Sequence, residues 1–156
     1  MKKIIVKMTM VMVLFILLGT LSACTEKTEA STKGSAFISA KEVTAEYEHT
    51  IATLSFPEGF PMETPTFEEA DYQKGFGETM AYQTWQMAWE KEWLNTYETQ
   101  PEKAKVALEQ LDKALHYPYM GPEKCDDATR NFFKDALTKA KAGDPSGFAE
   151  DVKVNG

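Results

Sequence analysis

A stretch of 35 residues without proline, from Thr66 to Gln100, constrains the fold of this chain more than any other feature. Five aromatic side chains within it recur every three or four residues: Tyr82, Trp85, Trp89, Trp93 and Tyr97. That spacing is the period of an α-helix. Thr66 also begins a capping-box pattern, because a glutamate follows it three residues later. The stretch predicts one long helix over 67–97, which Gly75 and Gly77 are expected to bend or interrupt.

A shorter helix is predicted before this stretch. Ser39 and Glu42 form a second capping box, and apolar residues at helical spacing follow them. The first helix should therefore cover about 40–54. The segment 56–65 carries three prolines and a glycine, so it is predicted to cross the domain as a loop.

Two more helices are predicted after the long one. Pro101 occupies the first turn of a third helix, which must end before Pro118 because proline blocks a helix interior. A fourth helix begins at Asp126 or Asp127 and stops at Gly143, and one short terminal turn follows. No segment alternates convincingly in the manner of a strand. The predicted fold class is all-α, a small bundle of four main helices with a short C-terminal helix.

The first 23 residues have the form of a cleaved signal peptide, in which three lysines precede an apolar run over 8–18. The run leads to Leu21-Ser22-Ala23-Cys24, which resembles the lipobox of bacterial lipoproteins. This resemblance implies cleavage before Cys24 and a diacylglyceryl group on its thiol, and two acyl chains anchor a protein stably. The alternative is an uncleaved transmembrane helix, which needs about 20 apolar residues and fits this short run less well.

Three regions follow from this reading. Residues 1–23 are predicted to be a lipoprotein signal peptide, residues 24–36 the lipidated cysteine with a flexible tether, and residues 37–156 a helical domain. The segment from Thr25 to Ser35 contains no large apolar side chain that a core could bury. The expected location is the extracytoplasmic face of the cell membrane, with the lipid on Cys24 as the anchor.

The charge of the chain restricts its partners. Without the three lysines of the leader, 14 basic and 24 acidic side chains remain, which gives a net charge of -10. Such a surface repels phosphate backbones, so nucleic acid is excluded as an expected partner. A cationic amphipathic peptide is compatible with this charge, and an envelope protein is the other partner considered.

The aromatic face of the long helix is the candidate ligand site, with these residues: Tyr82, Trp85, Trp89, Glu90 and Trp93. Two interpretations stay open. Aromatic stripes at helical spacing usually belong to the core. Alternatively, Gln86 and Glu90 beside indole edges suit an amphipathic ligand that carries positive charge. The second interpretation predicts an exposed apolar patch of several hundred Å² around Trp85 and Trp89.

The side chains that could support catalysis are few. His49 and His116 are the two histidines of the chain, and no serine lies in a nucleophile-elbow pattern. The histidines and cysteines do not have the spacing of a zinc site. Cys125 has no disulfide partner once Cys24 is lipidated. We therefore predict a non-enzymatic protein without catalytic residues, metal ligands or cofactor.

One block of the long helix resembles a known group. Gly75-Phe76-Gly77-Glu78, Ala81-Tyr82, Trp85 and Ala88-Trp89-Glu90 are similar to small helical lipoproteins of the lantibiotic self-immunity type. This resemblance implies a tethered protein that sequesters a membrane-active peptide, with Tyr82, Trp85, Trp89 and Glu90 as contacts. Two alternatives remain, a structural or adaptor lipoprotein of an envelope complex and an enzyme that acts on the cell wall.

Overall fold

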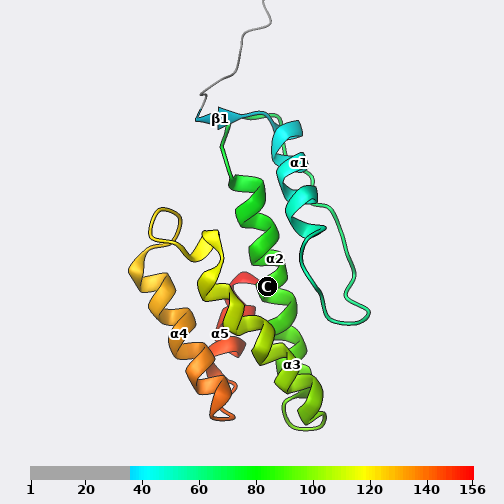
Figure 1. The fold of residues 1–156 in the computed structure, drawn as a ribbon, viewed down its shortest axis with the longest axis vertical. Coiled ribbons are helices and arrows are strands. Elements are labelled where there is room, and N and C mark those ends of the chain that lie inside the picture. Colours follow the sequence, from blue (N-terminus) through cyan, green and yellow to red (C-terminus); the bar gives the residue numbers. More distant parts are fainter. Residues whose placement is uncertain (1–35) are drawn as a thin grey trace, which may run out of the picture. The chain divides into compact units, whose positions relative to one another are not determined.

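The computed structural model describes residues 36–156. The predicted signal peptide, the lipidation site at Cys24 and nearly all of the predicted tether lie outside the described residues. The described part contains five α-helices and two very short strands, so the all-α prediction is confirmed (Figure 1). The α-helices are α1 (Ala40–Ile51), α2 (Phe76–Thr96), α3 (Pro101–Leu111), α4 (Asp127–Lys141) and α5 (Ser146–Asn155).

Shorter elements join these helices. Strands β1 (Phe37–Ile38) and β2 (Tyr72–Gln73) form one antiparallel pair, in which Phe37 lies opposite Gln73. Two 3₁₀ helices, η1 (Asp112–His116) and η2 (Pro118–Met120), connect α3 to the segment before α4. Among residues 36–156, none of the helices is long and apolar enough to cross a bilayer.

The N-terminus of α1 is built as its capping box predicts. The backbone N–H of Ser39 donates to the Glu42 carboxylate at 2.9 Å, and the N–H of Glu42 donates to the Ser39 hydroxyl at 3.4 Å. These two bonds satisfy donors that a helix start otherwise leaves without partners. The helix ends at Ile51, three residues before the predicted end.

The prediction that the long helix starts at position 67 is wrong, because α2 starts at Phe76. Gly75 adopts a left-handed φ of 83°, which interrupts the helical path. The carboxylate of Glu46 on α1 accepts hydrogen bonds from the N–H groups of Gly75 at 3.0 Å and Gly77 at 3.2 Å. A carboxylate from another helix thus caps α2. Tyr72 and Gln73, which were predicted to be helical, form β2 and pair with β1.

The later helices follow the predicted start and stop signals. Asp126 caps α4, since its carboxylate accepts the N–H of Thr129 at 2.7 Å, and Gly143 follows the helix with a φ of 83°. The terminal turn is longer than expected and forms α5, a helix of 10 residues. Its Gly147 packs so closely that a Cβ there would lie 2.5 Å from Cα of Ala136 on α4.

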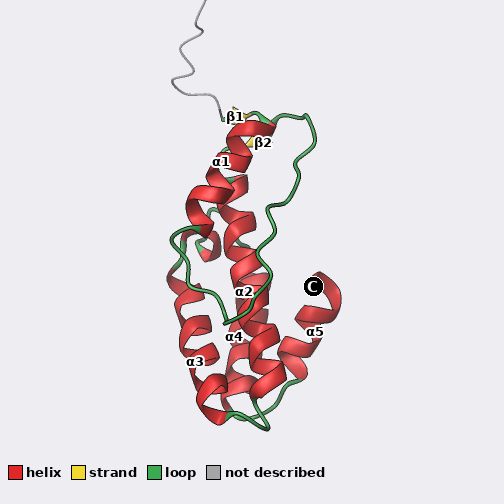
Figure 2. Cartoon of the chain, turned by 90° about the vertical axis from the view of Figure 1, so that its right-hand side faces the viewer, coloured by secondary structure: helices red, strands yellow, loops and turns green. Residues whose placement is uncertain are grey.

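Helix α2 is the central element of the domain, because α1, α3 and α5 all pack against it (Figure 2). The largest enclosed side chains come from α2 and from the helices around it. They include Trp85 and Trp93 of α2, Leu111 of α3, Phe133 of α4 and Phe148 of α5. This arrangement turns most faces of α2 toward protein, which determines what its aromatic residues can contact.

Candidate functional site

The five residues expected to form an exposed ligand site lie in the core. Tyr82, Trp85, Trp89, Glu90 and Trp93 are each at most 9% exposed. The rings pack against other elements of the protein: Tyr82 stacks between Tyr117 and Tyr119, and Trp93 meets Phe148 of α5 edge-on. The expected exposed aromatic patch is therefore wrong, and the stripe is the face through which α2 builds the core.

Two of these tryptophans also position a loop. The indole N–H groups of Trp85 and Trp89 both donate to the backbone carbonyl of Ser55, each at 2.9 Å. Residues four apart lie on one face of a helix, so both indoles can reach the same oxygen. These two hydrogen bonds to one carbonyl oxygen hold the chain that follows α1 against α2. Pro57 and Glu58 then lie beside Trp89.

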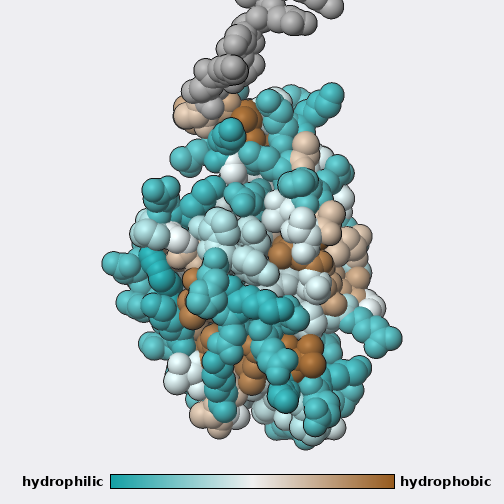
Figure 3. Space-filling model, viewed as in Figure 1, coloured by the Kyte–Doolittle hydropathy of each residue, from teal (hydrophilic) through white to brown (hydrophobic). Residues whose placement is uncertain are grey.

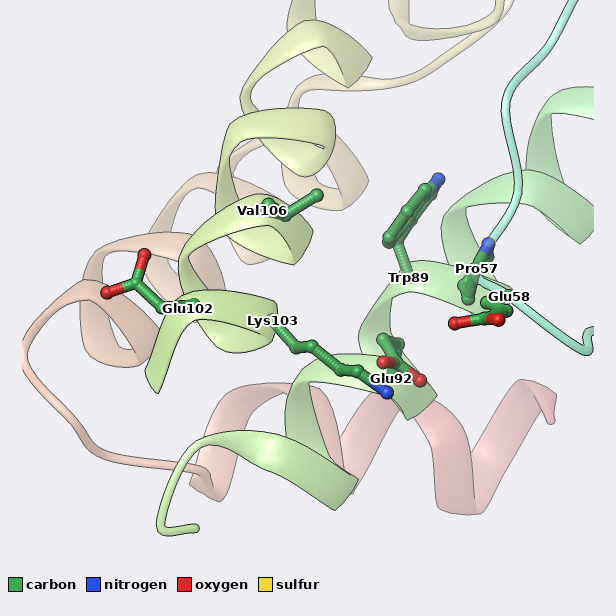
Figure 4. A pocket seen from close by; sticks show the side chains of 7 residues that line it. All are labelled: Pro57, Glu58, Trp89, Glu92, Glu102, Lys103 and Val106. Carbon is green, nitrogen blue, oxygen red and sulfur yellow. The ribbon is translucent and has the colours of Figure 1, made fainter. Parts of the chain in front are cut away.

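A pocket of about 280 Å³ opens at this place. It lies between the loop, α2 and α3, and Figure 4 shows its side chains from close by. Its lining consists of Pro57, Glu58, Trp89, Glu92, Glu102, Lys103 and Val106. Of the five predicted site residues, Trp89 alone lines this pocket.

The lining combines an apolar wall with negative charge. Pro57, Trp89 and Val106 supply the apolar side chains, whereas Glu58, Glu92 and Glu102 supply three carboxylates against the single ammonium of Lys103. A small cationic group attached to an apolar chain satisfies both parts of such a lining. In Figure 4, the Lys103 side chain extends from α3 toward Glu92, whereas the Glu102 carboxylate points away from Trp89 on the other side of α3. The protein's own cation therefore lies beside the Glu92 carboxylate.

Glu90 has a structural role. Gln86 donates to Glu90 at 2.8 Å and to Asp151 of α5 at 3.2 Å, and the Tyr119 hydroxyl donates to Gln86 at 2.6 Å. Burial, together with the smaller effect of the nearby negative charge of Asp151, raises the pKa of Glu90 to about 9. Glu90 is consequently neutral near pH 7, so it offers no charge to a cationic ligand.

The remaining candidates for chemistry stay apart. Within residues 36–156, no group of three or more His, Cys, Asp or Glu side chains is arranged to hold a metal ion. Burial, more than any neighbouring charge, raises the pKa of the Cys125 thiol, and Arg130 opposes that shift. The thiol lies 3.8 Å from the Met120 sulfur. This contact is typical of a cysteine that packs as a small apolar residue.

Sequence reasoning missed Glu58, Glu92, Glu102, Lys103 and Val106 as members of one pocket. They come from three separate segments, and each is a common residue at an unremarkable position. The Ser55 carbonyl that brings these segments together has no side-chain signature. No protein-family model, no curated protein and no solved structure matches this chain, so its own side chains are the basis for a functional assignment.

Proposed function

We propose that this chain is a non-enzymatic binding protein, anchored by lipid on Cys24 at the extracytoplasmic face of the membrane. Its ligand is a cationic amphipathic peptide of the lantibiotic type, which it sequesters as an immunity protein. The observation that carries this proposal is the pocket beside Trp89, where the carboxylates of Glu58 and Glu92 lie next to apolar side chains (Figure 4).

The size and charge of the pocket favour one basic side chain of a peptide. A volume of about 280 Å³ is just below the range of sites that enclose whole small molecules. A lysine of the ligand would place its methylenes on Trp89 and Val106 and its ammonium among the carboxylates. The net charge of -10 beyond the leader attracts such a peptide from a distance.

The first test is protection of a sensitive Gram-positive host. Cells that express the full chain should grow at higher concentrations of one class of cationic envelope-active peptide. Cys24→Ala should abolish the protection, because the protein would no longer be held where the peptide meets the membrane. Unchanged sensitivity to a panel of such peptides, with the protein present at the surface, would contradict the proposal and favour an adaptor role.

The second test assigns the binding to the pocket through a pair of opposite charge changes. Glu92→Gln should weaken binding of a protective peptide by about 2-fold to 5-fold, because one carboxylate is lost. Lys103→Gln should strengthen binding, because the competing internal ammonium is removed. Both affinities are measured by calorimetry on the purified lipoprotein.

Glu150→Gln provides the matched control for these variants. It makes the same charge change as Glu92→Gln on the exposed surface of α5, and Glu150 is no part of the pocket lining. Equal effects of Glu92→Gln and Glu150→Gln would mean that only the overall charge matters. Hydrolysis of cell-wall material by the purified protein would support the enzyme alternative instead.

A further inference from the structure

A cluster of aromatic rings lies where the described domain begins. Phe67, Tyr72 and Phe76 contact one another pairwise, with ring centroids 5.3 to 6.2 Å apart. Pairing of β1 with β2 brings Phe37 to the same end, since Lys74 donates its N–H to the Ala36 carbonyl at 2.9 Å. We call these four residues the aromatic end.

Part of this cluster faces solvent. Phe37 is 59% exposed and Phe76 is 38% exposed, although both are among the least water-soluble side chains. Figure 1 shows β1 at the end of the α1–α2 pair, and Figure 3 shows apolar side chains at that end of the surface. Exposed rings in one place mark a contact surface more often than scattered ones do.

The position of the aromatic end along the chain indicates what it contacts. Phe37 is only 13 residues after Cys24. Even a fully extended chain of that length spans no more than about 45 Å, so an acyl chain on Cys24 would keep these rings near the bilayer surface. At such short range, a weak contact becomes effective because the anchor supplies a high local concentration.

The charges beside the rings indicate which property of the lipid matters. Lys41 and Lys74 are exposed next to this end, but so are four acidic residues: Glu42, Glu68, Glu69 and Asp71. Because acids outnumber lysines there, an anionic lipid surface gains no net attraction. The rings themselves must provide the affinity, as aromatic side chains do at the boundary between headgroups and acyl chains.

We propose that the aromatic end inserts Phe37 and Phe76 shallowly into the lipid bilayer and so orients the domain on the membrane. This inference rests on the proposed lipid anchor. It also sets the position of the ligand pocket, because Trp89 lies 13 residues beyond Phe76 along α2. A helix of that length spans about 20 Å, which places the pocket above the headgroups and within reach of an arriving peptide.

The test uses tryptophan as a depth probe. The full chain carrying Phe37→Trp is purified as the lipoprotein and reconstituted into phosphatidylcholine vesicles, with or without bromine on the acyl chains. Bromine quenches indoles at acyl-chain depth, so the emission added by Phe37→Trp should fall by about half in brominated vesicles. The three native tryptophans are buried and serve as the unquenched reference.

Val154→Trp is the matched control. Val154 is 73% exposed and lies near the C-terminus on α5, so its indole should keep its emission. Quenching at position 37 alone supports the proposal. Quenching at neither position, or equal quenching at both, overturns the proposal. Quenching at neither position would point to a protein partner for the aromatic end.

Whether Cys24 carries a lipid anchor is measured separately from the insertion of the aromatic end. Mass spectrometry of the purified chain shows whether Cys24 carries the diacylglyceryl group, which tests the proposed function and not the aromatic end. If it does not, the mature chain with Cys125→Ser is coupled through Cys24 to a maleimide lipid, and the quenching comparison is repeated. Circular dichroism of each variant confirms that the substitution leaves the helices intact.

Discussion

At the scale of single residues, Glu90 is the side chain with the most consequential surroundings. It is fully buried, and its Oε2 accepts no hydrogen bond from the described residues. A proton on that oxygen resolves the conflict, because the acid can then donate to Asp151, whose Oδ1 is already bonded to the Asn155 amide at 2.7 Å. The neutral form of this buried acid is therefore the one that the contact between α2 and α5 accommodates.

This arrangement predicts a stability that falls as pH rises. Burial raises the pKa of Glu90 from 4.5 to about 9, so the unfolded chain loses its proton at lower pH than the folded one. Between these values the free energy of unfolding should decrease with pH, by at most about 1.4 kcal/mol per pH unit for one group. Urea unfolding from pH 4.5 to 9 measures the slope.

Substitution of Glu90 should flatten this pH dependence. Glu90→Gln keeps the shape and cannot ionise, so the variant should be more stable than the native protein at pH 8.5 and similar to it at pH 4.5. Glu150→Gln, on the exposed face of α5, should leave the slope unchanged. An unaltered slope in Glu90→Gln would show that another group titrates.

At the scale of elements, the contact between α1 and α2 depends on Gly77. A Cβ at that position would collide with the Val43 carbonyl and lie 2.9 Å from the Glu46 Cβ. Helix propensity alone predicts that Gly77→Ala stabilises α2 by about 1 kcal/mol. We expect the opposite, a loss of about 2 kcal/mol or more, because the two backbones must separate.

Chemical denaturation of Gly77→Ala measures this change in the free energy of unfolding. Gln83→Ala is the control, since Gln83 is an exposed residue of the same helix and its replacement should change stability by less than about 0.5 kcal/mol. A more stable Gly77→Ala variant would mean that α1 and α2 do not pack as closely as described.

The same elements explain what sequence could predict. Ser39, Asp126 and Gly143 act through neighbours a few residues away, so the start of α1 and both ends of α4 could be predicted from local patterns. The start of α2 was not, because it depends on Glu46, 29 residues before Gly75. The pocket was missed for a related reason: the segments that carry Glu58, Glu92 and Glu102 come together only after the loop and two helices have packed.

At the scale of the whole molecule, negative charge should dominate encounters with the proposed ligand. A net charge of -10 beyond the leader creates a field that extends beyond the pocket itself. Raising the salt concentration from about 0.05 M to 0.5 M shortens the screening length severalfold. The association rate of a protective cationic peptide should therefore fall by about tenfold or more, whereas its dissociation rate should change little.

Stopped-flow or surface-based kinetics at the two salt concentrations measure both rates. An uncharged analogue of the peptide, with each lysine replaced by acetyl-lysine, should associate at a rate that does not depend on salt concentration. If the cationic peptide also associates at the same rate in both conditions, long-range attraction has no part in capture and the acidic surface serves another purpose.

The placement of the tryptophans has a spectroscopic consequence. All three belong to α2, and two of them donate to the Ser55 carbonyl, so the tryptophan fluorescence of the folded domain arises from a single helix. Release of that loop would expose Trp85 and Trp89 to water together and move their emission to longer wavelengths. The tryptophan emission of this protein would thus report an opening of the loop beside the pocket.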